Sequence, residues 1–301
     1  MKIMPASLNV ILKNVLTEAA KRKASTIHFT VGAYPSLRVD EELIEMQDVE
    51  IIDKSSMEEM MKAMLDEVQK KNFEENKSIS IVKTVADKFR LRLNFFYQKG
   101  NVSAELRLID SQPPPLINLG LPKAVYALAD SHSGLIIVTG PYGSGRTTTI
   151  ASFLSEINKS RKANIITLEQ PIEYLHVNKM SLIEQREVGK DVNSFLDGLA
   201  YCQESDVDVI SVSKGSEAGV IPQILRFASS GRLAFLQMDT NSSVQTIESI
   251  LASFGPDQRE RGQLVLSEAL LAIIVQRLVP RIGGGQALAA EVLIANEAMR
   301  S

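Results

Sequence analysis

The residues Gly140-Pro-Tyr-Gly-Ser-Gly145-Arg146-Thr147 decide the fold of the larger part of the chain. They follow an apolar run at 135–139 that is typical of a buried strand, and they precede a stretch with helical character. Two such glycines followed by a cation and a hydroxyl residue, between a strand and a helix, form the pattern of a phosphate-binding loop. The pattern predicts backbone N–H groups that point at phosphate oxygens, beside a helix N-terminus.

This loop predicts a nucleotide, ATP or ADP, as the ligand. The residues expected to bind it are Gly140, Pro141, Tyr142, Gly143, Ser144, Gly145, Arg146, Thr147 and Thr148. Thr147 is also the expected hydroxyl ligand of a magnesium ion. Arg146 stands where the pattern has lysine, and its planar, forked guanidinium does not reproduce a compact ammonium between phosphates. We therefore expect phosphate binding to be retained and the positioning of the transition state to be lost.

The sequence after residue 118 alternates short apolar runs with helical stretches. Runs typical of strands occupy residues 135–139, 165–168, 207–212 and 233–237. Continuous apolar strands suit a parallel sheet that is covered by helices on both faces. The sequence therefore predicts an α/β domain over residues 119–301.

The sequence up to residue 110 has a different pattern. Helical spacing of apolar residues occurs at 8–19 and 55–73, and strand-like runs occur at 26–31, 36–39, 79–85, 89–96 and 102–109. These segments predict a small α+β domain around an antiparallel sheet over residues 1–110. Three consecutive prolines at 113–115 fit neither a helix nor a central strand, so we expect a proline-rich linker at 111–118.

The composition excludes several classes of function. The chain has 301 residues with 33 basic and 36 acidic side chains, a balance that does not favour nucleic acid as the main partner. Its one cysteine, Cys202, cannot form a disulfide or a thiolate metal site within the chain. The start does not resemble a signal peptide, and the most apolar stretch, 264–279, is too short and too polar for a membrane span. We expect a cytoplasmic protein without direct membrane insertion.

The chain resembles the PilT-like branch of the type II and type IV secretion ATPases over essentially its whole length. The matching runs are residues 25–32, 37–40, 89–94, 119–122, 185–189, 283–285 and 290–294. This resemblance implies a RecA-like P-loop ATPase domain behind a PAS-like N-terminal domain. It also implies a motor of pilus retraction and twitching motility, whose last helices are missing from this chain.

Four catalytic boxes of that family are altered here. The phosphate loop has Arg146 for lysine. The family's Glu-Asp-Pro-Ile-Glu reads Glu-Gln-Pro-Ile-Glu at 169–173, so Gln170 replaces an aspartate. The Walker-B-like stretch ends in Lys214 where the family has glutamate, and Asp239 replaces the histidine of Thr-Leu-His-Thr. The resemblance leaves Glu169 as the best remaining catalytic candidate, and Asp239 could supply a carboxylate from the histidine position.

Lys214 has the largest expected consequence because it reverses a charge beside the expected metal. A pair of unit charges at about 4 Å is worth roughly 4 kcal/mol at an effective dielectric constant near 20. Magnesium is thus disfavoured, and the loss of a positioned base alone costs about 10²–10⁴ in rate. Lys214 could instead contact a nucleotide phosphate in place of the metal.

The resemblance also implies partners. Arg92 and Arg107, with Arg90 beside them, would reach the nucleotide at a subunit boundary, although ordinary surface ion pairs would explain them equally well. A hexamer of this chain, or a mixed ring with an active pilus ATPase, would act on the platform protein at the inner-membrane base of a pilus. Three functions remain open: a degenerate nucleotide-binding subunit, a slow ATPase that drives retraction, and a scaffold without nucleotide.

Overall fold

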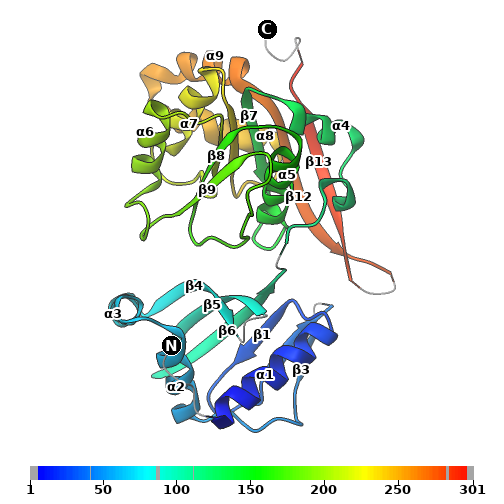
Figure 1. Cartoon of the computed structure of the whole chain (residues 1–301), viewed down its shortest axis with the longest axis vertical. Helices are drawn as coiled ribbons and strands as arrows, with labels where there is room; N and C mark the ends of the chain where they lie inside the picture. Colours follow the sequence, from blue (N-terminus) through cyan, green and yellow to red (C-terminus); the bar gives the residue numbers. More distant parts are fainter. Residues whose placement is uncertain (1–5, 41, 86–88, 111, 283–284, 297–301) are drawn as a thin grey trace. The chain divides into compact units, whose positions relative to one another are not determined.

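The computed structural model describes residues 6–40, 42–85, 89–110, 112–282 and 285–296, and the chain divides into two compact units, 1–111 and 112–301 (Figure 1). Each unit has its own sheet and its own hydrophobic core. Gly283 and Gly284, part of the glycine run that carries the family resemblance, lie outside the described residues.

The first unit is built on an antiparallel sheet with the strand order β3-β2-β1-β6-β5-β4. The strands are β1 (Thr26–Phe29), β2 (Ser36–Val39), β3 (Glu42–Glu45), β4 (Ser78–Val85), β5 (Phe89–Gln98) and β6 (Asn101–Ile109). Side chains alternate along β5: Leu91, Leu93 and Phe95 are buried, and Arg92 lies on the opposite face. The buried side chains pack with those of α1 (Ala6–Lys21), whose apolar residues recur at helical spacing as the sequence predicts.

The prediction of a single helix at 55–73 is wrong. The structure has two helices, α2 (Lys54–Met64) and α3 (Glu67–Asn76), separated by Leu65 in an extended conformation. Asp66 begins the second helix: its carboxylate accepts the Gln69 N–H at 2.8 Å, and the Gln69 side chain accepts the Asp66 N–H at 3.1 Å. This reciprocal capping box satisfies two N–H groups at the helix start and so favours a new helix over a continuous one.

The second unit contains a sheet of order β13-β12-β7-β11-β10-β8-β9. The strands are β7 (Gly134–Thr139), β8 (Asn164–Glu169), β9 (Leu182–Glu187), β10 (Val209–Val212), β11 (Leu233–Gln237), β12 (Leu270–Pro280) and β13 (Gln286–Ile294). All neighbours are parallel except β13, which pairs antiparallel with β12. The expected parallel sheet is therefore present, and β9, β12 and β13 extend it beyond the four strands that sequence periodicity predicts.

Helices cover both faces of this sheet (Figure 1). The helices are α4 (Lys123–Tyr126), α5 (Arg146–Ser160), α6 (Phe195–Glu204), α7 (Val220–Ser229), α8 (Ser243–Ala252) and α9 (Arg259–Ala269), with 3-10 turns at Leu116–Leu119, Ala127–Asp130 and Pro256–Gln258. Helix α5 packs in one core with the segment that follows the linker, while α6 to α9 contribute to the other. The apolar stretch at 264–279 is split between α9 and β12. Within the described ranges no helix is long and apolar enough to cross a bilayer.

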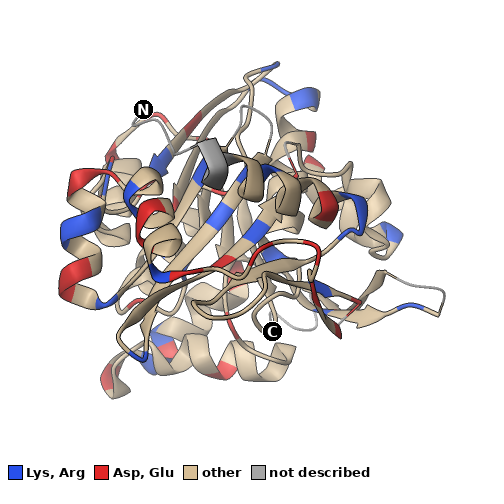
Figure 2. Ribbon diagram, turned by 90° about the horizontal axis from the view of Figure 1, so that it is seen from below, with Lys and Arg blue, Asp and Glu red and all other residues tan. Residues whose placement is uncertain are grey.

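The strand order determines which loops meet. β7 lies between β12 and β11, although β8 and β10 come between β7 and β11 in the sequence. Because the carboxyl ends of parallel strands share one edge of the sheet, the loop after β7 lies beside the segment after β11. Ligand sites of open α/β sheets form along this edge. In Figure 2, both basic and acidic residues are spread over the ribbons of the chain.

Candidate nucleotide-binding site

The loop between β7 and α5 has the backbone of an anion site. Gly140, Gly143 and Gly145 have φ values of 145°, 79° and 88°, which L side chains rarely adopt. A Cβ at Gly140 would lie 2.2 Å from the backbone oxygen of Gln276, whereas one at Gly143 would meet nothing within 4 Å. Among the described residues no side chain caps the first turn of α5, so its N–H groups can receive an anion. The loop thus fits a nucleotide phosphate.

The cation of the loop is engaged by the chain itself. Arg146 is buried, and its Nη1 donates to the backbone oxygen of Met238 and to the Asp239 carboxylate. The Asp239 side chain is 63% exposed and that of Arg146 only 8%. Two of the four altered boxes are therefore partners in one ion pair, although they are far apart in the sequence. Arg146, which replaces the lysine of the family, and Asp239, which replaces its histidine, neutralise each other's charge.

The two threonines in the first turn of α5 also have partners. Thr147 Oγ1 donates to Gln237 Oε1 at 3.4 Å, and the hydroxyls of Thr148 and Tyr174 lie 3.0 Å apart. Gln237 ends β11 and is the first residue of the altered histidine box at 237–240. Its amide oxygen accepts the Thr147 hydroxyl hydrogen, which leaves the lone pairs of Thr147 Oγ1 for a ligand such as magnesium.

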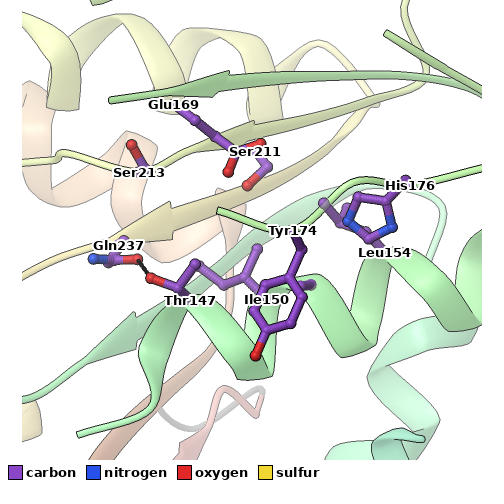
Figure 3. Close-up of a pocket in the computed structure, with 10 residues that line it drawn as sticks. Thr147, Ile150, Leu154, Glu169, Tyr174, His176, Ser211, Ser213 and Gln237 are labelled. Atoms are coloured by element: carbon purple, nitrogen blue, oxygen red, sulfur yellow. Dashed lines mark hydrogen bonds between the residues drawn. The ribbon is translucent and has the colours of Figure 1, made fainter. Parts of the chain in front are cut away.

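A pocket lies between α5 and the carboxyl ends of β8, β10 and β11 (Figure 3). It is lined by Thr147, Ile150, Ala151, Leu154, Glu169, Tyr174, His176, Ser211, Ser213 and Gln237. Figure 3 shows Glu169, Ser211 and Ser213 on the strand side and Thr147 with Ile150 on the helix side. The lining thus has hydroxyls, one amide, one imidazole and a single carboxylate.

Glu169 is that carboxylate, and its charge is disfavoured. Burial raises its pKa above the ordinary value, opposed by hydrogen bonds donated by Thr167 at 2.6 Å and by Gln185 at 3.2 Å, while the nearby charge of Glu173 raises the pKa further. A carboxyl with a raised pKa suits proton transfer better than it suits the binding of a hard cation. The geometry keeps Glu169 as a candidate acid or base.

The other two altered positions are exposed. Lys214 follows β10 and Gln170 follows β8, and neither side chain lines the pocket. Backbone bonds fix the segment that carries Lys214: Ser213 N–H donates to Leu168 O at 3.0 Å and Gly215 N–H to Gln237 O at 2.8 Å. Lys214 therefore stands at the same sheet edge as the phosphate loop, and its contact with a phosphate stays a prediction.

The donor set gives magnesium little support. Over the described ranges, no cluster of three or more His, Cys, Asp or Glu side chains could hold a metal ion. Magnesium is often held by one or two carboxylates together with substrate phosphates. The pocket offers a single carboxylate, Glu169, whose ionised form is disfavoured, beside the expected hydroxyl ligand Thr147. The residues fit a phosphate better than they fit the metal.

Arg92 and Arg107 belong to the first unit. They are directly opposite each other on β5 and β6, and Arg92 Nε donates to Ser80 Oγ at 3.2 Å. The pairing of the strands thus brings the two arginines together, and their contact with a nucleotide stays a prediction.

Sequence reasoning missed Gln237, Tyr174, His176, Ser211 and Ser213. Ser211 and Ser213 lie in the Walker-B-like stretch, and Gln237 directly precedes Met238 and Asp239. Their positions at the carboxyl ends of two predicted strands were a usable signal. Tyr174 and His176 follow the acidic box in an irregular segment, so no periodicity identifies them.

His176 makes stability depend on pH. Burial lowers its pKa to about 4, whereas an unfolded histidine has a value of about 6.5. The folded state keeps the ring neutral while the unfolded state binds a proton, so this contribution is present above about pH 6.5 and is lost as pH falls toward 4.

We expect His176→Gln to remove the loss of folding stability that protonation of this histidine causes at low pH. Between pH 7 and 4 the wild type should lose about 2–3 kcal/mol more unfolding free energy than the variant. Urea denaturation at a series of pH values measures the difference. His132→Gln, at an exposed position, is the control, and parallel curves for the wild type and His176→Gln would contradict the prediction.

Comparisons with known proteins show the family. The model of the type II/IV secretion system protein family matches residues 5–288. The chain is 31% identical over 290 residues to the type IV pilus retractation ATPase PilT of Pseudomonas aeruginosa, covering 96% of this chain and 84% of that protein. It is 34% identical to a twitching motility protein of Neisseria gonorrhoeae, covering 77% of this chain and 62% of that protein.

Solved structures share the fold. A crystal structure of the pilus retraction motor PilT with bound ADP has a TM-score of 0.86 and 40% identity, and the match covers 95% of this chain and 84% of that one. The ATPase DotB of Legionella pneumophila has a TM-score of 0.85 at 21% identity, covering 97% and 82%, and shows the fold alone. These matches establish the N-terminal and RecA-like domains. The chain therefore belongs to the type II/IV secretion system protein family, in its PilT-like branch of pilus retraction ATPases.

Proposed function

We propose that this chain is a nucleotide-binding subunit of a PilT-like pilus motor that binds ADP or ATP and hydrolyses ATP slowly or not at all. Its role would be regulatory or structural, in pilus retraction and twitching motility. The observation that carries the proposal is the ion pair of Arg146 with Asp239 beside an intact glycine loop. The loop retains the backbone that holds phosphates, while its cation is already paired within the chain.

The electrostatics of the pocket support weak or absent hydrolysis. Glu169 is its single carboxylate, and the Walker-B-like strand ends beside Lys214, a cation where the family has glutamate. Attack of water on a γ-phosphate needs an oriented nucleophile and compensation of the developing charge. The other polar groups of the pocket are hydroxyls, one amide and the imidazole of His176, and none of them supplies a negative charge to hold the metal that would compensate this charge.

The assembly is part of the proposal. We infer a hexameric ring of this chain, or a mixed ring with an active pilus ATPase, at the cytoplasmic face of an inner-membrane platform protein. Arg92 and Arg107 would reach a nucleotide at the subunit boundary of such a ring. The register of β5 and β6 places the two side chains directly opposite each other, on one face of the sheet.

Nucleotide affinity should be nearly independent of magnesium. We expect the dissociation constant of ADP to change by less than about threefold, under 1 kcal/mol, when magnesium is replaced by EDTA. The reason is that the pocket has a single carboxylate, Glu169, and burial raises the pKa of that carboxyl. Isothermal titration calorimetry with ADP in the two buffers measures the change.

The same titrations separate the competing functions. A scaffold would bind ADP in neither buffer. A working ATPase would bind more tightly with magnesium and release phosphate from ATP well above the background of Thr147→Ala. Either result would contradict the proposed function, and phosphate release at background level with magnesium-independent binding would support it.

A further inference from the structure

The segment that carries Asp239 is fixed against the phosphate loop by its backbone. Met238 N–H donates to Val138 O at 3.1 Å, and Thr240 N–H donates to Thr139 Oγ1 at 2.8 Å. These bonds flank Asp239 on both sides and join the end of β11 to the end of β7. The Asp239 side chain can rotate while its backbone stays in place.

The two members of the ion pair differ in how easily each can leave it. The Arg146 side chain is 8% exposed, so a guanidinium without an acceptor would be strongly unfavourable there. The Asp239 side chain is 63% exposed, and a carboxylate at this exposure is readily solvated by water. The Asp239 carboxylate can therefore leave Arg146 at a small cost in free energy, provided that another anion takes its place beside the guanidinium.

A nucleotide phosphate is such an anion. Guanidinium binds carboxylate and phosphate oxygens with the same forked geometry. Arg146 directly follows Gly145, the last residue of the loop that fits a phosphate. In the loop itself, the hydroxyl of Ser144 is buried and has no hydrogen-bond partner within the described part of the chain. A bound ligand could supply the missing partner.

We infer that Asp239 is a positioning residue that competes with the nucleotide for Arg146. In the nucleotide-free chain its carboxylate holds the guanidinium, and a bound phosphate displaces it. The measured affinity is then lower than that of the loop alone, because binding must first break the pair. This inference rests on the proposed function, and it assigns Asp239 a role in regulating nucleotide affinity rather than in hydrolysis.

Asp239→Asn should bind ADP about tenfold more tightly than the wild type, because an ion pair with Arg146 is replaced by a hydrogen bond to a neutral acceptor, which a phosphate displaces more easily. Asp239→His tests the same change with a different neutral side chain, should the asparagine variant fold poorly. Asp257→Asn is the matched control. Asp257 is exposed, and its substitution removes the same negative charge at a position away from the loop. Circular dichroism confirms that each variant is folded, and calorimetry with ADP measures the affinity.

A double-mutant cycle separates competition from general repulsion. If Asp239 acts through Arg146, Asp239→Asn should not change ADP affinity in an Arg146→Ala background. If the gain persists there, Asp239 only repels phosphate through space, and the inference is wrong. A wild type that binds ADP together with an Asp239→Asn variant of equal or weaker affinity would also overturn the inference and leave the proposed function intact. Absence of ADP binding in the wild type and in every variant would overturn both.

Discussion

Replacing Gly140 with alanine should abolish measurable nucleotide binding and lower the free energy of unfolding by about 2–4 kcal/mol. The added Cβ would lie 2.2 Å from Gln276 O and 2.7 Å from Ser144 Oγ. Gln276 belongs to β12, which pairs with β7 inside the sheet, so this strand cannot move away cheaply. The loop must move instead, and its N–H groups lose their common direction.

The expected loss of affinity follows from the bonds that depend on this direction. Two or three charge-assisted hydrogen bonds from the loop, at about 1.5–3 kcal/mol each, amount to more than a hundredfold in the dissociation constant. ADP titration measures the affinity, and urea denaturation measures the stability.

Two other glycines provide the controls. Gly231→Ala tests positive φ alone, because Gly231 has φ of 87° and its Cβ would meet nothing within 4 Å. Gly143→Ala tests a loop position without the collision. If Gly140→Ala bound ADP as well as Gly143→Ala does, the loop would not be held against β12 in the way described here.

The phosphate loop was predictable because all of its determinants are local. The glycine spacing, the preceding apolar run and the helix that follows are consecutive in the sequence, and the structure places them as β7, loop and α5. The break between α2 and α3 was also encoded locally, by Asp66 and Gln69 at capping-box spacing. The helical periodicity of the apolar residues concealed this signal, since Met64 and Phe73 are buried on both sides of the break.

The Arg146–Asp239 pair could not be predicted from the sequence. The sequence order of the predicted strands is β7, β8, β10, β11, and their order in space is β7, β11, β10, β8. Periodicity gives the strands and not their neighbours, so nothing in the pattern places Asp239 beside the first residue of α5. The same crossover brings Gln237 to Thr147. The residues that distinguish this site from a plain phosphate loop are thus the ones that depend on strand order.

Restoring the family residue in all four altered boxes should raise ATP turnover by about 10²–10⁴. The variant is Arg146→Lys with Gln170→Asp, Lys214→Glu and Asp239→His. Lys214→Glu places a carboxylate at the carboxyl end of β10, beside the strand that carries Gln237. It also removes a positive charge from the edge where a metal would bind, which is worth several kcal/mol at short range. Phosphate release from ATP with and without magnesium measures the gain.

The four changes should act as a unit rather than additively. Arg146→Lys alone leaves Asp239 able to pair with the new ammonium, and Lys214→Glu alone leaves the cation of the loop bound to Asp239. Each single variant should therefore stay near the wild-type rate. Thr147→Ala in the fourfold background is the control, because it removes the expected metal ligand and should return turnover to background. If the fourfold variant folds but has no magnesium-dependent turnover, the prediction is wrong, and residues outside the four boxes prevent ATP hydrolysis at this site.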